Sequence, residues 1–251
     1  MRSVILHYHL FKNAGSSIDA ILQDSFGERW TNIDSPVGHT ISAQQMSKTI
    51  HARPELLAIS SHDLAPPLPL EEQVRVFPIV FLRHPIVRAK SAYLFEWGKQ
   101  QGLRQPERPF AEYVSERLSD ANGGVITNFQ ACRLANQSRS GPDPTPPGNE
   151  QEYLLRACRF IESLAFFGLV EAFEQSLTRM HFYLIAAFPQ LKVTHRRENV
   201  SQAIGGDIDA RIGAIAAELG PVLYRQLTER NRLDLELYEH ATTVFRHPLA
   251  H

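Results

Sequence analysis

The sequence predicts an α/β fold in which a parallel central sheet is flanked by helices on both faces. Short apolar runs alternate with longer amphipathic stretches along the 251 residues, and this alternation is typical of parallel strands joined by helices. Residues 76–82 are almost continuously apolar, as expected for a strand that is covered on both sides. A chain of this length can bury a large core, and we expect one domain over residues 1–251.

The first half of the chain supplies three predicted strands. In chain order, the strands are residues 3–9, 56–61 and 76–82, and the helices are residues 17–25, 43–51 and 86–99. Ile18, Ile21 and Leu22 fall on one face of the first helix, and Gly27 is a suitable residue to end it. Because ligands of parallel sheets bind at the carboxyl ends of the strands, the residues that follow these strands are the first candidates for function.

Two prolines indicate where the third strand is well paired and where the helix after it begins. Pro78 cannot donate a hydrogen bond within a sheet, so we expect the well-paired part of this strand to follow it. Pro85 suits the first turn of a helix and predicts that the helix begins there.

The second half continues the alternation. We expect helices at residues 110–118, 126–135 and 150–163, a strand at 166–170, a helix at 173–187, a strand at 191–194, and two closing helices. Residues 136–149 are rich in Pro, Gly and Ser, and we interpret them as a loop because the alternation resumes beyond them. The polar stretch 195–209 is interpreted as a segment that could cover a ligand.

Composition excludes several classes of protein. The 26 basic and 27 acidic side chains nearly cancel, so no overall charge favours nucleic acid as a partner. Cys132 and Cys158 do not have the spacing of metal ligands, and no metal is expected. The chain lacks the roughly 18 consecutive apolar residues of a membrane span, and its first strand follows Met1 without a signal peptide. We therefore expect a soluble, cytoplasmic protein.

The residues after the first strand have the composition of an anion-binding loop. Phe11 to Ser17 read FKNAGSS and lead into a helical pattern. Small side chains let backbone N–H groups approach an anion, the helix N-terminus adds partial positive charge, and Lys12 adds a full one. In the ATP-binding loop G-x-x-x-x-G-K-[ST] the lysine follows the glycine, whereas Lys12 precedes Gly15. Ordinary capping of the helix is the alternative interpretation.

A second anion motif follows the third strand, where Arg83 begins the segment RHPIVRAKSAY. Arg88 and Ser91 lie on one stripe of the predicted helix. A forked guanidinium together with a hydroxyl can hold a dianionic phosphate, and we assign this role to Arg83 and Ser91. For Arg88, and more firmly for Lys90, we favour the interpretation as a solvated or ion-paired helix residue.

A histidine follows the second strand. His62 ends the segment SSH, at the edge of the sheet where anion ligands gather, and is placed to act as a general base. Asp63 is not assigned as its partner, because adjacent residues on a strand point to opposite faces.

The lysine-containing loop, followed by an R-x-P-x-x-R-x-x-S-x-Y element, resembles the sulfotransferases that use 3′-phosphoadenosine 5′-phosphosulfate (PAPS). The spacing of the motifs is most similar to that of the carbohydrate branch, which includes heparan sulfate 2-O-sulfotransferases. Within this branch the chain resembles a soluble, bacterial-type member. The resemblance implies a P-loop-like sulfotransferase fold. Weaker similarity extends to residues 168–171, 197–201 and 231–238.

The resemblance also implies roles for individual residues. The 5′-phosphosulfate would lie in a loop formed by Lys12, Asn13, Ala14, Gly15, Ser16 and Ser17. Arg83 and Ser91 would bind the 3′-phosphate, with Ser201 and more loosely Arg197 closing over the nucleotide. His62 falls where the branch carries a base in a His-Gly-His-like element, although Ser60 replaces its first histidine. His84 replaces the usual aspartate after the arginine, which leaves the local ion pairing open.

The expected activity is transfer of a sulfuryl group from PAPS to a hydroxyl acceptor such as a glycan, without a metal. His62 would accept the proton of the hydroxyl, and Lys12 would stabilise the charge that develops on the donor. Two alternatives remain open at this stage: an ATP-dependent phosphotransferase with a P-loop, and a nucleotide- or glycan-binding protein without turnover.

Overall fold

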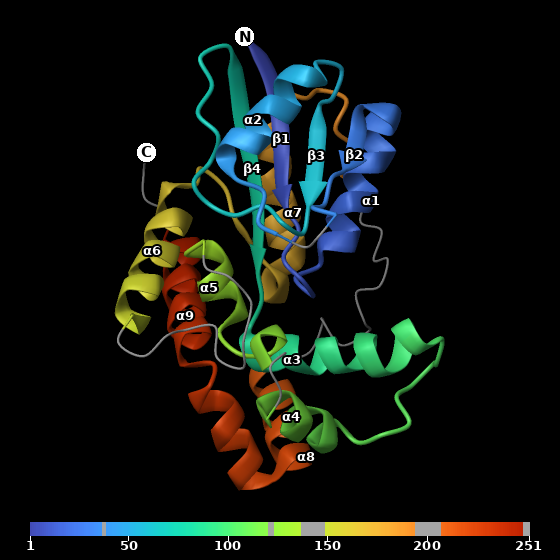
Figure 1. Ribbon diagram of the computed structural model, residues 1–251, viewed down its shortest axis with the longest axis vertical. Coiled ribbons are helices and arrows are strands. Elements are labelled where there is room, and N and C mark those ends of the chain that lie inside the picture. The colour runs from blue at the N-terminus through green and yellow to red at the C-terminus, as the bar shows by residue number, and fades with distance from the viewer. Residues whose placement is uncertain (37–38, 120–122, 137–148, 194–206, 248–251) are drawn as a thin grey trace.

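The central feature of the computed structural model is a parallel sheet whose strand order is β2-β3-β1-β4-β5 (Figure 1). The structure describes residues 1–36, 39–119, 123–136, 149–193 and 207–247. Within these ranges the strands are β1 (Arg2–Tyr8), β2 (Trp30–Asn32), β3 (Ala58–Ser61), β4 (Val74–Leu82) and β5 (Gly168–Leu169). All the pairings are parallel, so the predicted α/β class is confirmed.

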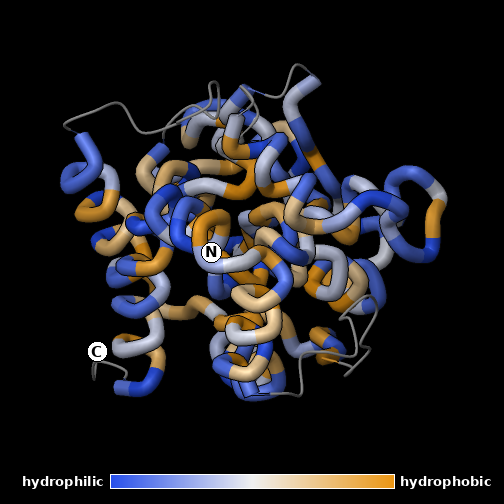
Figure 2. Tube along the Cα trace, turned by 90° about the horizontal axis from the view of Figure 1, so that it is seen from below, coloured by the Kyte–Doolittle hydropathy of each residue, from blue (hydrophilic) through white to orange (hydrophobic). Residues whose placement is uncertain are grey.

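Helices cover both faces of the sheet. One face packs against α1 (Gly15–Phe26) and α7 (Phe173–Leu184). The other face packs against α2 (Ala43–Ala52), α5 (Phe129–Leu134), α6 (Glu150–Ser163) and α9 (Arg232–Arg246). The helices in Figure 2 are banded with polar and apolar segments, as expected for helices that bury one stripe against a core.

A third group of helices lies below the strands, at their carboxyl ends (Figure 1). It consists of α3 (Pro85–Tyr93), α4 (Phe110–Ser119) and α8 (Ile208–Glu229), which share an apolar core of their own. Short helical turns occur along the chain: η1 (Gly27–Arg29) follows α1, the π-helical η2 (Leu94–Gly98) and η3 (Lys99–Gln101) follow α3, η4 (Gly123–Val125) precedes α5, and η5 (Val170–Ala172) precedes α7. The carboxyl edge of the sheet therefore faces a helical layer, and the candidate residues lie between the two.

Most predicted elements agree with the structure, and the predicted bounds of α6 are correct. The expectation for Pro78 is wrong, because β4 already pairs with β1 from Val74 onward. On its other side β4 pairs with β5 only at Phe81 and Leu82, so Pro78 lies where β4 is still an edge strand and a missing N–H is tolerated.

Two other differences concern short strands. Residues 191–193 of the predicted strand at 191–194 are not in a strand, and residue 194 lies outside the described ranges. The sequence prediction also missed β2, whose three residues border β3. Both segments are too short to show the alternation or apolar run on which strand prediction depends.

Helices α5 and α9 cap each other across more than 100 residues of sequence. The carboxylate of Asp234 accepts hydrogen bonds from the backbone N–H groups of Gln130 and Ala131 in the first turn of α5. In return, the side-chain oxygen of Asn128 accepts hydrogen bonds from the N–H groups of Leu233 and Asp234 in α9. These bonds satisfy N–H groups that a helix leaves without acceptors, so the two helices begin at positions that each fixes for the other.

Among the described helices, none has the length and apolar character needed to cross a bilayer.

Asn231 links the same two helices and provides a test of this arrangement. Its side chain is fully buried, donates to the carbonyls of Ile126 and Leu227, and accepts the N–H of Asn128. We expect Asn231→Ala to lower the free energy of unfolding in urea by about 2–4 kcal/mol, because buried partners lose their hydrogen bonds. Arg232→Ala, which removes only an exposed pair with Glu236, is the control and should cost less than about 0.5 kcal/mol. Equal effects of the two substitutions would contradict this assignment.

Candidate functional site

The loop between β1 and α1 is held in a conformation that ordinary residues adopt at a cost. Lys12 and Ala14 have φ angles of 65° and 62°, in the left-handed region that costs a non-glycine residue on the order of 1 kcal/mol. The buried side-chain amide of Asn13 holds the loop in place, because it donates to the carbonyl of Phe81 and to Oε1 of Gln130, both at 2.7 Å. The loop is thus fixed to the carboxyl end of β4.

Helix α1 begins at the end of this loop, and its N-terminus has no side-chain cap at the N-cap position. Ala14 occupies the N-cap position, makes no side-chain capping bond, and is followed by no acidic residue in the first turn. The first N–H groups of a helix have no acceptor within the helix, and together with the helix dipole they favour an anion. Gly15 is buried, whereas Ser16 is exposed beside it.

The ammonium group of Lys12 lies against aromatic rings. Its Nζ is 4.4 Å from the centre of the Phe95 ring and 5.8 Å from that of Phe11. Burial, reinforced by the neighbouring charge of Arg83, lowers the pKa of Lys12 to about 8. The amine therefore remains mostly protonated at neutral pH, and an anion bound close to it would stabilise the protonated form further.

Arg83, the first residue after β4, ties that strand to the loop. Its Nη1 donates to the carbonyl of Lys12 at 2.9 Å, and its backbone N–H and C=O both bond to the side chain of Gln130. Burial lowers the pKa of Arg83 to about 10, against the opposing effect of Glu171. Its Nε is buried and has no hydrogen-bond partner within the described part of the chain. A buried guanidinium N–H in that condition fits an anionic ligand.

Helix α3 runs from this point past the loop. Ser91 is half-buried, and one helical turn later the ring of Phe95 contacts both Phe11 and Lys12. Arg88 of the same helix has a structural role, because it is fully buried, donates to the carbonyl of Val125 and lies over the Phe129 ring. Lys90 forms an ion pair with Glu218.

His84, the residue after Arg83, is held by contacts with Glu171 and Tyr238. Its backbone N–H donates to Glu171, and its ring packs edge-on against Tyr238. The Tyr238 hydroxyl also donates to Glu171. Burial, reinforced by Arg211, lowers the pKa of His84 to about 4, so the ring is neutral at physiological pH.

His62 is paired with a carboxylate that the sequence prediction did not find. Nδ1 of His62 lies 3.0 Å from Oδ2 of Asp34, and the His62 backbone N–H donates to Oδ1 of the same residue at 2.7 Å. Burial and the neighbouring His9 lower the pKa of His62, and the bonds to Asp34 only partly offset them. A neutral imidazole whose Nδ1 proton is held by Asp34 presents Nε2 as its basic nitrogen. Asp63 instead bonds to Arg133 and to the N–H of Ser35.

A second histidine–carboxylate group lies beside the first. Asp19 of α1 accepts hydrogen bonds from Nδ1 of His7 and from Nδ1 of His9, each at 2.8 Å. Burial alone would raise the pKa of Asp19, but these two bonds hold it well below its usual range. The three side chains could also hold a metal ion. Since each Nδ1 already bonds to the carboxylate, we interpret them as a hydrogen-bonded cluster rather than as metal ligands.

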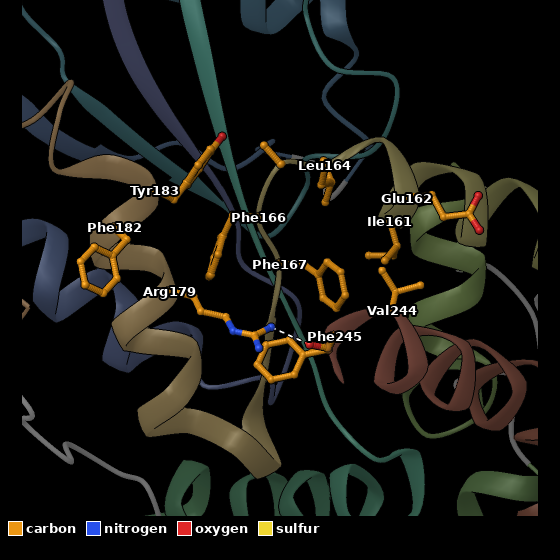
Figure 3. A pocket seen from close by; sticks show the side chains of 11 residues that line it. Ile161, Glu162, Leu164, Phe166, Phe167, Arg179, Phe182, Tyr183, Val244 and Phe245 are labelled. Carbon is orange, nitrogen blue, oxygen red and sulfur yellow. Dashed lines mark hydrogen bonds between the residues drawn. The ribbon is translucent and has the colours of Figure 1, made fainter. Parts of the chain in front are cut away.

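A pocket of about 500 Å³ lies elsewhere, between the ends of α6, α7 and α9 (Figure 3). Its lining is largely apolar, and Arg179 lies beside the Phe245 ring and donates to the carbonyl of that residue. This pocket contains none of the predicted site residues. A pocket of about 660 Å³ is lined by His84, Glu171 and Arg211 and by neighbouring residues.

The structure thus brings the predicted residues of three strand ends to one edge of the sheet. The loop of residues 12–17 follows β1, His62 follows β3, and Arg83 follows β4, with β1 between the other two strands. Ser201 and Arg197 lie outside the described residues. Sequence reasoning missed Asp34, Asp19 and Gln130. Of these three, only Asp19 could have been sought from a local pattern: its partners His7 and His9 are two positions apart at the predicted first strand, and residues at that spacing share a face.

Comparisons with known proteins place the chain in a family. No family model matches it. It is 31% identical over 256 residues to a protein of Archaeoglobus fulgidus that is described as an uncharacterized protein, and the alignment covers 98% of each chain. The chain belongs to the same family as this archaeal protein.

The contact between Gly15 and His9 offers a test of how the loop is built. A Cβ atom at Gly15 would overlap the imidazole of His9, which cannot move without losing its bond to Asp19. We expect Gly15→Ala to lower the free energy of unfolding by about 1–3 kcal/mol. Gly213→Ala is the matched control, since nothing lies within 4 Å of a Cβ there. It should be neutral or stabilise helix α8 by up to about 1 kcal/mol. A neutral Gly15→Ala would refute the close packing of this loop.

Proposed function

We propose that this chain is a sulfotransferase that moves the sulfuryl group of PAPS to a hydroxyl acceptor, with His62 as the general base. The observation that carries the proposal is the juxtaposition, at one edge of the sheet, of an uncapped helix N-terminus with Lys12, the Arg83 guanidinium, and the His62–Asp34 pair. This set combines an anion-binding half with a basic half, as transfer of an anionic group to a hydroxyl requires.

The anion-binding half of the site, which consists of the loop of residues 12–17 with Arg83 and Ser91, fits a nucleotide donor that carries phosphate groups on both its 5′ and its 3′ positions. Lys12 and the N–H groups at the start of α1 would hold the 5′-phosphosulfate, together with Asn13, Ala14, Gly15, Ser16 and Ser17. Arg83 and Ser91 would hold the 3′-phosphate, and the Nε of Arg83, which has no hydrogen-bond partner among the described residues, supports this role. The resemblance of both motifs to PAPS-dependent enzymes agrees with this arrangement, and with a P-loop-like fold for the sheet and its first loop.

The proposed reaction is a displacement at sulfur. The acceptor oxygen forms a bond to sulfur, the bond between sulfur and the 5′-phosphate oxygen breaks, and adenosine 3′,5′-bisphosphate (PAP) leaves. His62 takes the hydroxyl proton on Nε2, while Asp34 holds the opposite side of the ring and stabilises the imidazolium that forms. Lys12 stabilises the charge that develops on the leaving phosphate. No metal is part of this proposal.

The acceptor is proposed to be a carbohydrate or glycoconjugate, because the motifs resemble the carbohydrate branch most. Nucleic acid is not proposed as a partner, since the charges of the chain nearly cancel. Cys132 and Cys158 are free thiols, which fits the proposal of a cytoplasmic, reducing location.

The direct test is transfer of radiolabelled sulfate from PAPS to a panel of glycan and phenol acceptors. We expect transfer by the unmodified protein and a loss of at least about 100-fold in His62→Ala, because the general base is removed. Binding of PAP, measured by calorimetry, should persist in that variant. His51→Ala is the control, since His51 is an exposed histidine that also bonds to a carboxylate, and its activity should be unchanged.

The same calorimetry separates this proposal from ATP chemistry. PAP should bind more tightly than adenosine 5′-monophosphate, because only PAP has a 3′-phosphate for Arg83 and Ser91 to hold. Tight binding of Mg-ATP with no measurable affinity for PAP would refute the proposal and favour a phosphotransferase. Binding of PAP without transfer to any acceptor would favour a protein that binds nucleotide without turnover.

The lowered pKa of Lys12 gives a pH dependence with a definite sign. A bound anion stabilises the protonated amine, so affinity for PAP should be highest near pH 7 and fall as pH rises through about 8. The decline approaches tenfold per pH unit, since one proton is involved. The phosphates of PAP are already dianionic in this range. Lys12→Arg keeps the charge at all these pH values, and its affinity should lack this decline. Parallel pH curves for the two proteins would contradict the role of Lys12.

A further inference from the structure

The imidazole of His62 is one of a column of histidine rings. The rings of His62 and His9 are stacked with their centres 3.9 Å apart and their planes at 29°. The ring of His9 is stacked in turn with that of His7, at 5.3 Å and 24°. His7 lies in β1, His9 follows that strand directly after Tyr8, and His62 follows β3, the neighbour of β1 in the sheet.

His9 has little freedom to move within this column. Its Nδ1 bonds to Asp19, its ring lies directly against the Cα atom of Gly15, and its residue is 9% exposed. His62 is less confined, since its side chain is 40% exposed and that of Asp34 is 38% exposed. A hydrogen bond between two such exposed groups gives weak orientation on its own. The face of His9 supplies the rigid surface against which the His62 ring rests.

The backbone on either side of the His62 ring is fixed as well. The N–H of His62 donates to Asp34, and its carbonyl accepts a hydrogen bond from Arg133 of α5. The charged and titratable groups at the two rings include Asp34 from the loop after β2, Asp19 from α1 and His7 from β1. Burial and the neighbouring His9 lower the pKa of His62.

We propose that His9, held by Asp19 and Gly15, is a positioning residue for His62, because its ring orients the base. The inference rests on the proposed function, in which His62 accepts the proton of the acceptor. In this arrangement Asp19 holds the ring of His9, which it contacts directly, and the face of that ring holds His62.

The effect of His9 on His62 is tested by NMR titration of the His62 imidazole, which needs no substrate. His9→Phe keeps a flat ring without the imidazole nitrogens, and the midpoint of His62 should rise by about 0.5–1 pH unit. An unchanged His62 midpoint in the folded variant would overturn the contact between the two rings. The absence of nuclear Overhauser contacts between the His9 and His62 rings in the unmodified protein would overturn it as well, whether or not the variant folds.

The positioning role is tested by comparing two substitutions in the PAPS transfer assay. His9→Asn retains a donor for Asp19 but removes the ring, and we expect transfer to fall about 10–100-fold while affinity for PAP is unchanged. His9→Phe should restore most of the rate, with the acidic limb of the pH profile moved to higher pH. His51→Phe, at an exposed histidine that pairs with Glu71, is the control and should change neither quantity.

The outcomes separate the two proposals. Equal rates and pH profiles for His9→Asn, His9→Phe and the unmodified protein would overturn the positioning role while leaving the proposed function intact. A raised His62 midpoint in His9→Phe, together with no transfer from PAPS to any acceptor by the unmodified protein, would instead show that the histidine pair exists and that the sulfotransferase assignment is wrong.

Discussion

The side chain of Gln130 is the contact on which the rest of the candidate site depends. Its Oε1 accepts hydrogen bonds from the Asn13 side chain and from the Arg83 backbone, and its Nε2 donates to the Arg83 carbonyl. One buried amide therefore joins the loop after β1 to the end of β4. Its own position is set by Asp234, which accepts the Gln130 backbone N–H. A buried amide has few ways to satisfy all its hydrogen bonds, so the relative position of Lys12 and Arg83 is determined by helices that bind no ligand in the proposed function.

This dependence explains why a strained loop persists at the edge of a well-packed sheet. The left-handed residues Lys12 and Ala14 would relax if the loop were held only by its ends. Asn13 lies between them and is anchored to Phe81 and Gln130, while Gly15 packs against His9 just beyond them. The α5–α9 capping pair thus stabilises more than two helices, because it also maintains the loop from which α1 presents its N-terminus.

The sequence predicted what is local and missed what is brought together by the fold. The alternation of apolar and amphipathic segments was sufficient for the sheet class, and α6 shows one strong helical period between clear limits. The loop of residues 12–17, Arg83 and His62 could be found because each follows a strand directly. Asp34 could not, because it reaches His62 across 28 positions of sequence and follows a strand of only three residues. Gln130 appeared to be an ordinary helix residue, since its partners at Asn13 and Arg83 lie 117 and 47 positions away.

Burial acts on both halves of the site, but with opposite consequences. It lowers the pKa of Lys12 and that of His62. For His62 this favours the neutral form that a base needs, whereas for Lys12 it raises the free energy of the protonated form, which an anion then stabilises. The proposed site needs a positive charge at Lys12 and a neutral imidazole at His62, and therefore a group that separates these two side chains. His9 occupies that position, between Gly15 at the start of α1 and the ring of His62. Because Asp19 lies on α1 itself, the helix that would bind the donor also holds the ring on which the base rests, and a shift of that helix would move both halves of the site together.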